Sequence, residues 1–436
     1  MWGLALSFLA WVGLNPLPFA AGLIGTTEPA MKLLISILMA YPMAIVYHEH
    51  FRKHAQYRNL FFIAAGADMA FFNFGLSMYH NAIPAIIIFA STKLLGPGKI
   101  NAIFSLVFNM GYLLVGYVVT ESEDYDITWT MPHCVLTLKL IALTFDLWDG
   151  QRMMNQEVLS ANNKKSAVTQ SPTLEELLGF VYFPASFLVG PIFSFKRYKE
   201  YISDIYPLDT EAKVYEEHSK KRLFQGLAYL AAFQIGASSI RFGLSYNGSR
   251  TDEHGQVTSS WDACNNIQPF QFENATKFQH YINSFNCNTN YFAAEYVYKR
   301  LKFLGNRNIS QMLTLLFLAV WHGTQSGYYA TFFNEFIIII MEKDLEGILS
   351  KTQLYHNVWA NTYGRYALYA LLKTYTIVFM GWSLVPITLK TFSKWWQVYT
   401  SLWFSGFLLF VPWSFVYKPA LIYVIKRFNI ERVRAD

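Results

Sequence analysis

The stretch LLFLAVWHGTQSGYYATFF at 315–333 places His322 between two uncharged, mainly apolar runs. A helix that crosses a bilayer needs about 20 mainly apolar residues, and apolar runs of this kind are typical of such helices. The stretch therefore predicts two membrane helices, over 309–321 and 324–342, that meet beside His322.

Similar apolar runs recur along the chain, and no fixed internal period supports the inverted repeats of transporters. We therefore expect an all-α, polytopic membrane protein with about ten or eleven transmembrane or re-entrant helices. We expect residues 1–436 to form a single membrane domain. Two shorter or proline-interrupted runs, 2–24 and 81–95, fit interfacial or re-entrant helices. The other clear runs are 29–47, 59–79, 100–120, 132–148, 174–195, 223–245, 366–389 and 399–425.

The composition also indicates a membrane protein. Hydrophobic residues make up 53% of the chain and charged residues 15%, whereas an ordinary globular chain has about 25% charged residues. The net charge of +6 is modest and comes in short clusters between apolar runs. Such clusters are typical of cytoplasmic loops, so we expect a lipid bilayer as partner and no nucleic acid.

Polar segments separate the apolar runs. Residues 48–58 are basic, and the segments 150–172 and 196–222 also carry lysines and arginines. The longest segment, 247–307, contains or adjoins glycosylation sequons at Asn247, Asn274 and Asn308. Use of all three would require a lumenal segment, but its aromatic content also fits burial, so its side of the membrane stays open. The tail at 426–436 holds four basic residues and is expected in the cytosol.

The chain has three cysteines, Cys134, Cys264 and Cys287. They make no disulfide framework and match no zinc spacing. A Cys264–Cys287 bridge would require their segment to be lumenal. We expect neither a metal site nor a bound cofactor. The N-terminus lacks the basic start and small-residue cleavage site of a signal peptide.

His322 is the sharpest candidate for chemistry, because an ionisable side chain inside a membrane segment is costly. Gly323 follows it and would let a ligand or another backbone segment come close. From these residues alone, a structural role in hydrogen bonding a neighbouring helix is an equal alternative.

A second candidate is the segment SFNCNTN, with Asn286, Asn288 and Asn290. Asparagine favours turns and helix starts, so a capped loop is the alternative interpretation for at least two of the three.

A third cluster contains His48, Glu49, His50 and His54. His50 and His54 form an HxxxH pair, but the di-iron desaturases that use such boxes need several of them. With basic neighbours on the same segment, the cluster is better interpreted as the cytoplasmic end of a helix. GPGK at 96–99 has the wrong spacing for a phosphate loop, and the chain has no GxSxG nucleophile elbow.

Several of these residues carry a resemblance to the membrane-bound O-acyltransferases. WHG at 321–323 closes an apolar helix, and Asn286 precedes it at a spacing similar to that of the family signature. Within the family, the resemblance is closest to its lysophospholipid acyltransferases. Five blocks carry it: YDITWTMPHCVLTLKL (125–140), FPASFLVGPIFS (183–194), WDACNN (261–266), SFNCNTN (284–290) and KRLKFLGNRNISQMLTLLFLAVWHGTQSGYY (299–329).

The resemblance implies a multi-pass enzyme of the endoplasmic reticulum membrane that surrounds an internal reaction chamber. It implies acyl transfer from acyl-CoA to the free sn-2 hydroxyl of a lysophospholipid, with lysophosphatidylcholine as the expected acceptor. A homodimer is left open. The resemblance assigns catalysis to His322 and Asn286, within catalytic segments at 284–342. It assigns substrate contacts to Trp321, Gly323, Asn288 and Asn290.

Elementary chemistry agrees with this assignment. A hydroxyl needs a base aligned with its proton, and histidine has an unperturbed pKa near 6.5. The thioester oxyanion needs a fixed donor, which an asparagine amide supplies. An acyl-enzyme intermediate is not needed, because the sequence offers no activated Ser or Cys to form one. Cations for the phosphates of the coenzyme are expected at Lys299, Arg300 and Lys302, with Arg307 nearby; a topology role is the alternative for all of them.

The chain departs from the family pattern near 235–247. Related proteins carry a further aromatic helical stretch there that helps line the reaction chamber, and this chain passes across without it. A catalytically impaired scaffold or lipid-binding protein is therefore the alternative to an active enzyme. A family member with another acceptor, such as a protein, a sterol or diacylglycerol, is a further alternative.

Overall fold

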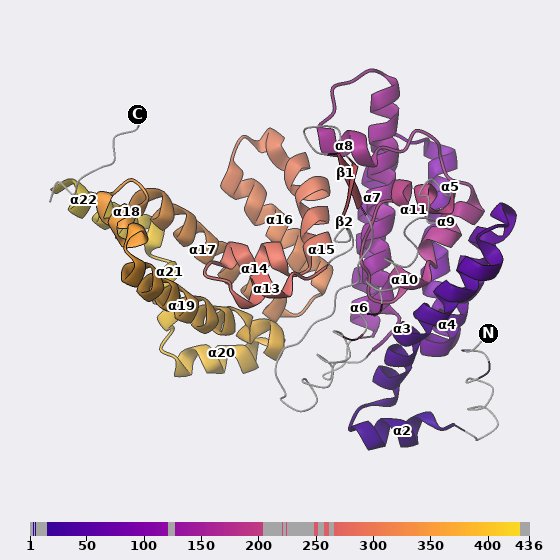
Figure 1. Cartoon of the computed structure of the whole chain (residues 1–436), viewed down its shortest axis with the longest axis horizontal. Coiled ribbons are helices and arrows are strands. Elements are labelled where there is room, and N and C mark those ends of the chain that lie inside the picture. The colour runs from indigo at the N-terminus through magenta and orange to yellow at the C-terminus, as the bar shows by residue number, and fades with distance from the viewer. Residues whose placement is uncertain are drawn as a thin grey trace. The chain divides into compact units, whose positions relative to one another are not determined.

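The computed structural model describes residues 3, 5, 15–120, 127–203, 220, 224, 248–251, 257–260 and 266–427 (Figure 1). By its internal contacts the chain divides into two compact units. Unit 1 comprises residues 1–240 and 244–265, and unit 2 comprises residues 241–243 and 266–436. Apart from Phe224, the helix predicted at 223–245 lies outside the described residues.

Unit 1 consists of helices and one short hairpin. Its long helices confirm the apolar runs predicted at 29–47, 59–79, 100–120 and 132–148. Strands β1 (Gly248–Thr251) and β2 (Val257–Ser260) pair antiparallel, which the helical prediction missed. The helices are α2 (Leu17–Ile24), α3 (Glu28–Val46), α4 (Arg58–Phe74), α5 (Tyr79–Leu95), α6 (Lys99–Val119), α7 (Thr130–Met154), α8 (Ala161–Ser166), α9 (Leu174–Val181), α10 (Pro184–Phe187) and α11 (Phe195–Ile202).

The predicted helix at 174–195 is wrong, because the structure forms two short helices there. Helix α9 begins with a capping box in which Thr173 and Glu176 bond each other's backbone. It ends at Val181, and Pro184, which lacks a backbone N–H, starts the four-residue α10. The segment is apolar because it fills the core of unit 1.

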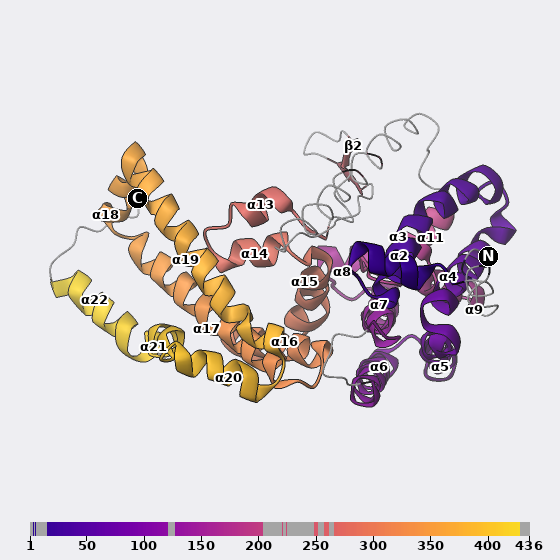
Figure 2. The same cartoon turned by 90° about the horizontal axis from the view of Figure 1, so that it is seen from below.

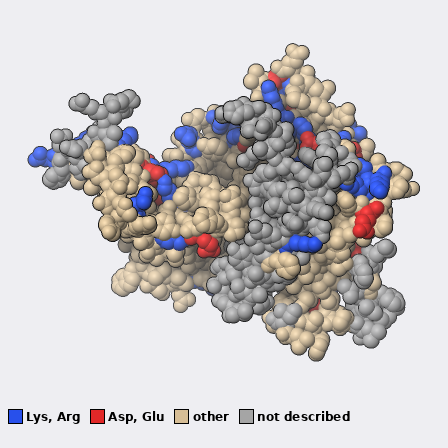
Figure 3. All heavy atoms as spheres, in the orientation of Figure 1, with Lys and Arg blue, Asp and Glu red and all other residues tan. Residues whose placement is uncertain are grey.

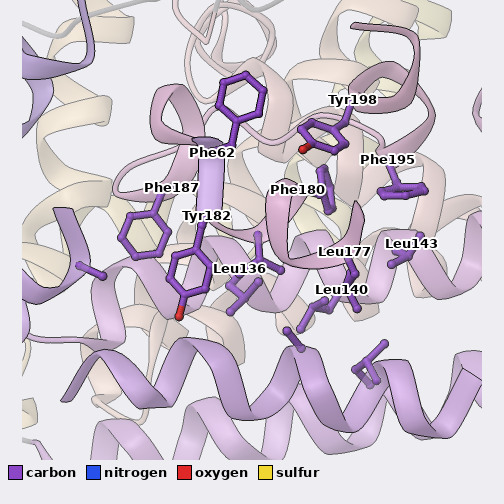
Figure 4. Close-up of a cluster of buried hydrophobic side chains, with 14 of the residues drawn as sticks. Phe62, Leu136, Leu140, Leu143, Leu177, Phe180, Tyr182, Phe187, Phe195 and Tyr198 are labelled. Carbon is purple, nitrogen blue, oxygen red and sulfur yellow. The ribbon is translucent and has the colours of Figure 1, made fainter. Parts of the chain in front are cut away.

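That core forms where the α9–α10 segment packs on α4 and α7 (Figure 4). Phe180, Tyr182 and Phe187 lie beside Leu136 and Leu140 in the same buried cluster. Apolar burial of this kind contributes roughly 25 cal/mol per Å² of area removed from solvent.

Unit 2 contains a set of long helices preceded by short ones. Helices α16 (Arg307–His322), α17 (Ser326–Leu349) and α19 (Thr362–Leu389) confirm three predicted runs (Figure 2). Most of the run predicted at 399–425 lies in the continuous helical stretch Ser405–Arg427, which is long and apolar enough to span a membrane. The short elements are α13 (Pro269–Glu273), α14 (Phe278–Ser284), α15 (Cys287–Phe292), π-helix η4 (Ala293–Tyr298), 3-10 helix η5 (Lys299–Leu304), α18 (Gln353–Ala360), α20 (Phe392–Ser401), α21 (Ser405–Phe410), π-helix η6 (Trp413–Tyr417) and α22 (Lys418–Arg427).

The core of unit 2 is aromatic, and two consecutive buried hydrogen bonds fix it. Trp382, Trp395 and Tyr399 pack together in it. The amide of Asn334 donates to the hydroxyl of Tyr399 at 2.8 Å, and this hydroxyl donates to the carbonyl of Trp382 at 2.9 Å. Helices α17, α19 and α20 are thereby held together, because a buried polar group is stable only when it is hydrogen-bonded.

Helix α6 shows why this fold belongs in a membrane. It buries Asn101, Ser105 and Asn109 completely, whereas Val107 is 66% exposed and Val115 is 64% exposed. Polar residues inside and apolar residues outside are the reverse of a helix in water. Apolar outer faces on this scale require lipid. Among the described residues on the face drawn in Figure 3, most of the surface is accordingly uncharged, with Lys and Arg in separate groups.

Six helical stretches within the described residues are long and apolar enough to span a membrane. One of them, Ala55–Leu95, holds both α4 and α5. This number is below the predicted ten or eleven because the run at 174–195 forms short helices and α16 has only 16 residues, and because the run at 223–245 lies outside the described residues apart from Phe224. The chain is a polytopic, predominantly helical membrane protein. The prediction of a single domain over 1–436 stays a prediction.

Candidate active site

His322 is the last residue of α16. Its ring lies among the aromatic rings of Trp321 at 4.7 Å, Tyr328 at 5.6 Å and Phe332 at 5.4 Å between centroids. Neither ring nitrogen makes a hydrogen bond within the described part of the chain. An imidazole with unused nitrogens, surrounded by apolar rings, can accept a proton from a bound hydroxyl.

The turn after His322 is fixed by its glycines. Gly323 has φ 142°, which an L side chain rarely adopts. At Gly327 an added Cβ would lie 2.1 Å from the carbonyl oxygen of Pro386, so α17 touches α19 closely here. The N–H of Gly327 and the hydroxyl of Ser326 both donate to the carbonyl of Lys390, at 2.8 and 3.3 Å. His322 therefore sits at an anchored helix end.

The asparagine segment is clamped by the residues that precede α13. Asn286 is the N-cap residue of α15 and has left-handed backbone angles, φ 49° and ψ 39°. The carbonyl of Asn266 accepts from the N–H of Cys287 at 3.0 Å, and its side-chain oxygen accepts from the N–H of Asn288 at 3.2 Å. Its side-chain amide donates to the side-chain oxygen of Asn286 at 3.4 Å.

These bonds separate the three asparagines by role. The amide of Asn290 donates to the carbonyls of Ile282 and Phe285, at 2.6 and 2.8 Å, so it holds the loop. At Asn286 the side-chain oxygen accepts from Asn266, and the amide nitrogen makes no hydrogen bond to a described residue. The amide nitrogen of Asn288 is buried without a partner in the described residues. Asn286 and Asn288 thus both offer a donor within the described residues. The capped-loop interpretation fits Asn290, which holds the loop, and it also fits the backbone of Asn286, which begins α15.

The elements that carry His322 and Asn286 lie side by side within unit 2. The ring of Phe292, at the end of α15, stacks on that of Phe317 of α16 with 6.2 Å between centroids. Phe292 follows Asn286 by about two turns of helix, and Phe317 precedes His322 by about one and a half. No hydrogen bond joins the two side chains in the described structure, so their joint action stays a prediction.

The predicted phosphate cations lie at the other end of α16. Lys299 and Arg300 are half-buried, Lys302 is exposed, and all belong to η5. Lys299 pairs with Glu295 at 2.5 Å. Ser310 in the first turn of α16 donates to the carbonyl of Leu301 in η5 at 3.1 Å, so about 18 Å of helix lies between this contact and His322. In acyl-CoA the long pantetheine arm likewise separates the phosphates, which the cations would bind, from the thioester, which would react beside His322.

The histidine cluster at 48–54 ends α3, as the helix-end interpretation predicts. His48 contacts Arg52 at 3.2 Å in the π-helical turn η1 (Tyr47–Phe51). His54 lies beyond that turn as the N-cap of the 3-10 helix η2 (Ala55–Tyr57). The two histidines of the HxxxH pair therefore do not share one helix face.

A Cys264–Cys287 bridge, the alternative that would require a lumenal segment, involves a residue outside the described part of the chain. The thiol of Cys287 donates to the carbonyl of Asn283 at 3.2 Å.

Several positioning residues escaped prediction from single residues. Asn266 lies in the block WDACNN, which the resemblance included without a role. Ser326, Gly327 and Trp395 hold the turn after His322, and the indole N–H of Trp395 donates to the hydroxyl of Ser326 at 3.1 Å. A glycine four residues after the WHG motif was the available signal, because glycine in a helix often marks a close approach.

Comparisons with known proteins identify the family of this chain. The model of the membrane-bound O-acyltransferase family matches residues 114–237 and 219–385. The chain belongs to this family. It is 34% identical to lysophospholipid acyltransferase 5 of Drosophila melanogaster, covering 90% of this chain and 88% of the relative. The mouse protein of the same name is 35% identical over 93% and 92%, and the human one 35% over 90% and 89%.

The alignments also bear on length. The alignment with the Drosophila protein runs over 450 positions, although it covers only 90% of a chain of 436 residues. This membrane-bound O-acyltransferase therefore lacks residues that the relative has. The two family-model matches meet at 219–237, next to the segment 235–247 where the shortening is predicted; that segment lies outside the described residues.

Proposed function

We propose that this protein transfers a fatty acyl group from acyl-CoA to the free sn-2 hydroxyl of a lysophospholipid, in the membrane of the endoplasmic reticulum. Lysophosphatidylcholine is the first acceptor to test. The observation that carries the proposal is His322 at an anchored helix end with unused ring nitrogens. It is supported by relatives named lysophospholipid acyltransferase 5 that align with most of the chain.

In the proposed reaction, the imidazole of His322 accepts the proton of the acceptor hydroxyl as the oxygen attacks the thioester carbonyl. The amide of Asn286, or that of Asn288, donates to the oxyanion that develops. The carbonyl re-forms, the carbon–sulfur bond breaks and the coenzyme thiolate takes the proton from the imidazolium. The products are a phospholipid ester and free coenzyme A, without an acyl-enzyme.

The apolar surroundings of His322 contribute to this chemistry. Aromatic rings exclude water from the base, which limits hydrolysis of the thioester. Lys299, Arg300 and Lys302 would bind the phosphates of the coenzyme from the other end of α16, and Trp321 and Gly323 would contact the reacting groups.

The direct test is an acyl-transfer assay on the purified full-length chain in mixed micelles. It uses radiolabelled oleoyl-CoA with lysophosphatidylcholine and follows labelled phosphatidylcholine and released thiol. The proposal expects one thiol per ester formed. Thiol release without ester would show hydrolysis and contradict the proposal. An acceptor panel tests specificity: faster labelling of diacylglycerol, a sterol or a peptide would reassign the acceptor.

A second candidate function has one specific observation in its favour. The alignment with the Drosophila protein contains gaps in this chain, and the resemblance implies that chamber-lining residues are missing near 235–247. A scaffold or lipid-binding protein without catalysis is therefore the alternative. Monodisperse, cooperatively unfolding protein that forms no product above background would favour it.

A further inference from the structure

A cavity in unit 1 lies apart from all the residues assigned above. It encloses about 230 Å³ between α3, α4, the α10 segment and α11. Apart from Arg197 and three tyrosines, its lining residues are apolar. Its dimensions and chemistry suit an alkyl chain, because alkyl chains bind where apolar walls replace water.

The cavity has a deep end and a basic end. At the deep end, the amide of Asn73 in α4 donates to the hydroxyl of Ser36 in α3 at 2.7 Å, so the lining residues Ile37 and Met69 lie near this pair. At the other end, the ring of Tyr201 stacks on that of Tyr47 with 5.9 Å between centroids.

Helix α11 crosses the basic end. Arg58, at the start of α4, donates to the carbonyl of Ile202 in α11. Along α3 the lining residues run from Ile37 to Ala44, about 10 Å. The cavity therefore runs along the membrane helix toward its charged end.

Positive charge concentrates at that end. Helix α11 carries three cations and one carboxylate, and Arg197 lines the cavity itself. Lys199 is paired with Glu176 at 3.1 Å. The segment 48–58, which ends α3, adds Arg52, Lys53 and Arg58 against Glu49. Basic clusters at the end of a membrane helix attract anionic lipid head groups by about 1 kcal/mol per cation.

The cavity is also reachable from lipid. Ala44 of α3 and Ala185 of α10 line it and are exposed, and Val189 is 49% exposed. Ile45, next to Ala44, is 57% exposed on the outer surface of α3. An alkyl chain could enter sideways between α3 and the α10 segment without leaving the apolar phase.

We propose that this cavity binds an intact anionic phospholipid of the bilayer. One acyl chain lies between α3 and the α10 segment, and the phosphate lies on Arg197. The site goes beyond the proposed acyl transfer, since its lining residues all belong to unit 1 whereas His322 and Asn286 belong to unit 2.

The test is photolabelling of the full-length chain in nanodiscs with phosphatidylserine that carries a diazirine at the end of one acyl chain. Adducts mapped by mass spectrometry are expected on Ile37, Met69 or Leu188. Ala44→Trp narrows the cavity from its exposed rim and should lower this labelling at least tenfold. Leu38→Trp lies on α3 outside the cavity lining and should leave it unchanged.

Arg197→Gln should lower labelling by phosphatidylserine several-fold, while Lys196→Gln, next to it but outside the lining, should change it less than twofold. Equal labelling of Leu38 and Ile37 would overturn the proposal. Equal labelling of the Ala44→Trp variant and the unchanged chain would also overturn it. So would displacement of the probe by lysophosphatidylcholine at lower concentration than by phosphatidylserine. The His322→Ala variant should label normally, which separates this site from the fate of the proposed activity.

Discussion

Helices α7 and α16 each hold a basic side chain in apolar surroundings, but in opposite ways. Lys139 lies in the middle of α7, is 1% exposed and donates to the carbonyl of Phe180 at 2.6 Å and the hydroxyl of Ser186 at 3.2 Å. Its ammonium also lies 4.3 Å from the ring centroid of Phe180. His322 ends α16 beside a glycine turn, and its ring nitrogens make no hydrogen bond in the described structure.

The difference supports a structural role for Lys139 and the proposed reactive role of His322. A buried polar group costs free energy unless it is hydrogen-bonded. Lys139 meets that requirement by tying α7 to the α9–α10 segment. The hydrogen-bonding capacity of His322 is unused within the described chain, and it lies where helix geometry ends. Unused nitrogens at a helix end are therefore the feature on which the proposed role of His322 depends.

The largest effect on activity is expected from a substitution of Asn286. Like the ring nitrogens of His322, its amide nitrogen makes no hydrogen bond to a described residue, so its loss tests whether such unused groups act on the substrate. Asn286→Gly keeps the left-handed backbone and removes the amide. If this amide stabilises the oxyanion, kcat should fall by about 10²–10³. Steady-state kinetics on oleoyl-CoA and lysophosphatidylcholine measure this.

The matched control is Asn290→Ala, whose amide holds the loop. It should lower the melting temperature in detergent more than Asn286→Gly does. Asn286→Gly with unchanged kcat, together with a large loss in Asn288→Ala, would move the oxyanion role to Asn288.

Gly327→Ala tests whether the anchored turn matters to His322. The added methyl group would collide with the carbonyl of Pro386 and push α17 from α19. We expect about a tenfold loss of kcat/KM and a lower melting temperature, since overpacking costs about 1–3 kcal/mol.

Gly347→Ala is the control on the same helix, where an added Cβ meets nothing within 4 Å. It should be neutral or slightly stabilising, by up to about 1 kcal/mol. Equal effects of the two substitutions would remove the anchored turn from the account.

Lys139→Met gives the smallest expected effect on activity and could break the comparison. Methionine fills a similar volume and needs no hydrogen bond, so transfer should stay within about twofold of the unchanged chain. Lys139→Ala should instead lower stability by about 2–5 kcal/mol, because it opens a cavity in the core. Loss of transfer in a well-folded Lys139→Met variant would make Lys139 functional.

The sequence predicted the long helices well because a membrane helix requires a long run of apolar residues, which can be recognised in the sequence. It failed at 174–195, where apolar residues fill the core of unit 1 as short helices broken before Pro184. Apolar length alone does not distinguish a segment that faces lipid from one that faces protein. The hairpin β1–β2 was missed because its residues carry no apolar alternation.

For the candidate site, the sequence indicated the residue types but could not supply their partners. The identity of His322 followed from one costly ionisable group and a family resemblance. The separate roles of Asn286 and Asn290 depend on which amide atoms are already bonded, which is a property of the folded loop. Asn266, which clamps that loop, could be assigned only from its three hydrogen bonds.

The central claim is that His322 is the general base. The measurement that tests it most directly is acyl transfer by His322→Ala beside His356→Ala, which changes a histidine on the exposed helix α18. General-base catalysis contributes about 10²–10⁴-fold, so His322→Ala should lose at least a hundredfold in kcat, with its melting temperature unchanged. His356→Ala should stay within twofold of the unchanged chain. Retention of most transfer by folded His322→Ala would contradict the assignment.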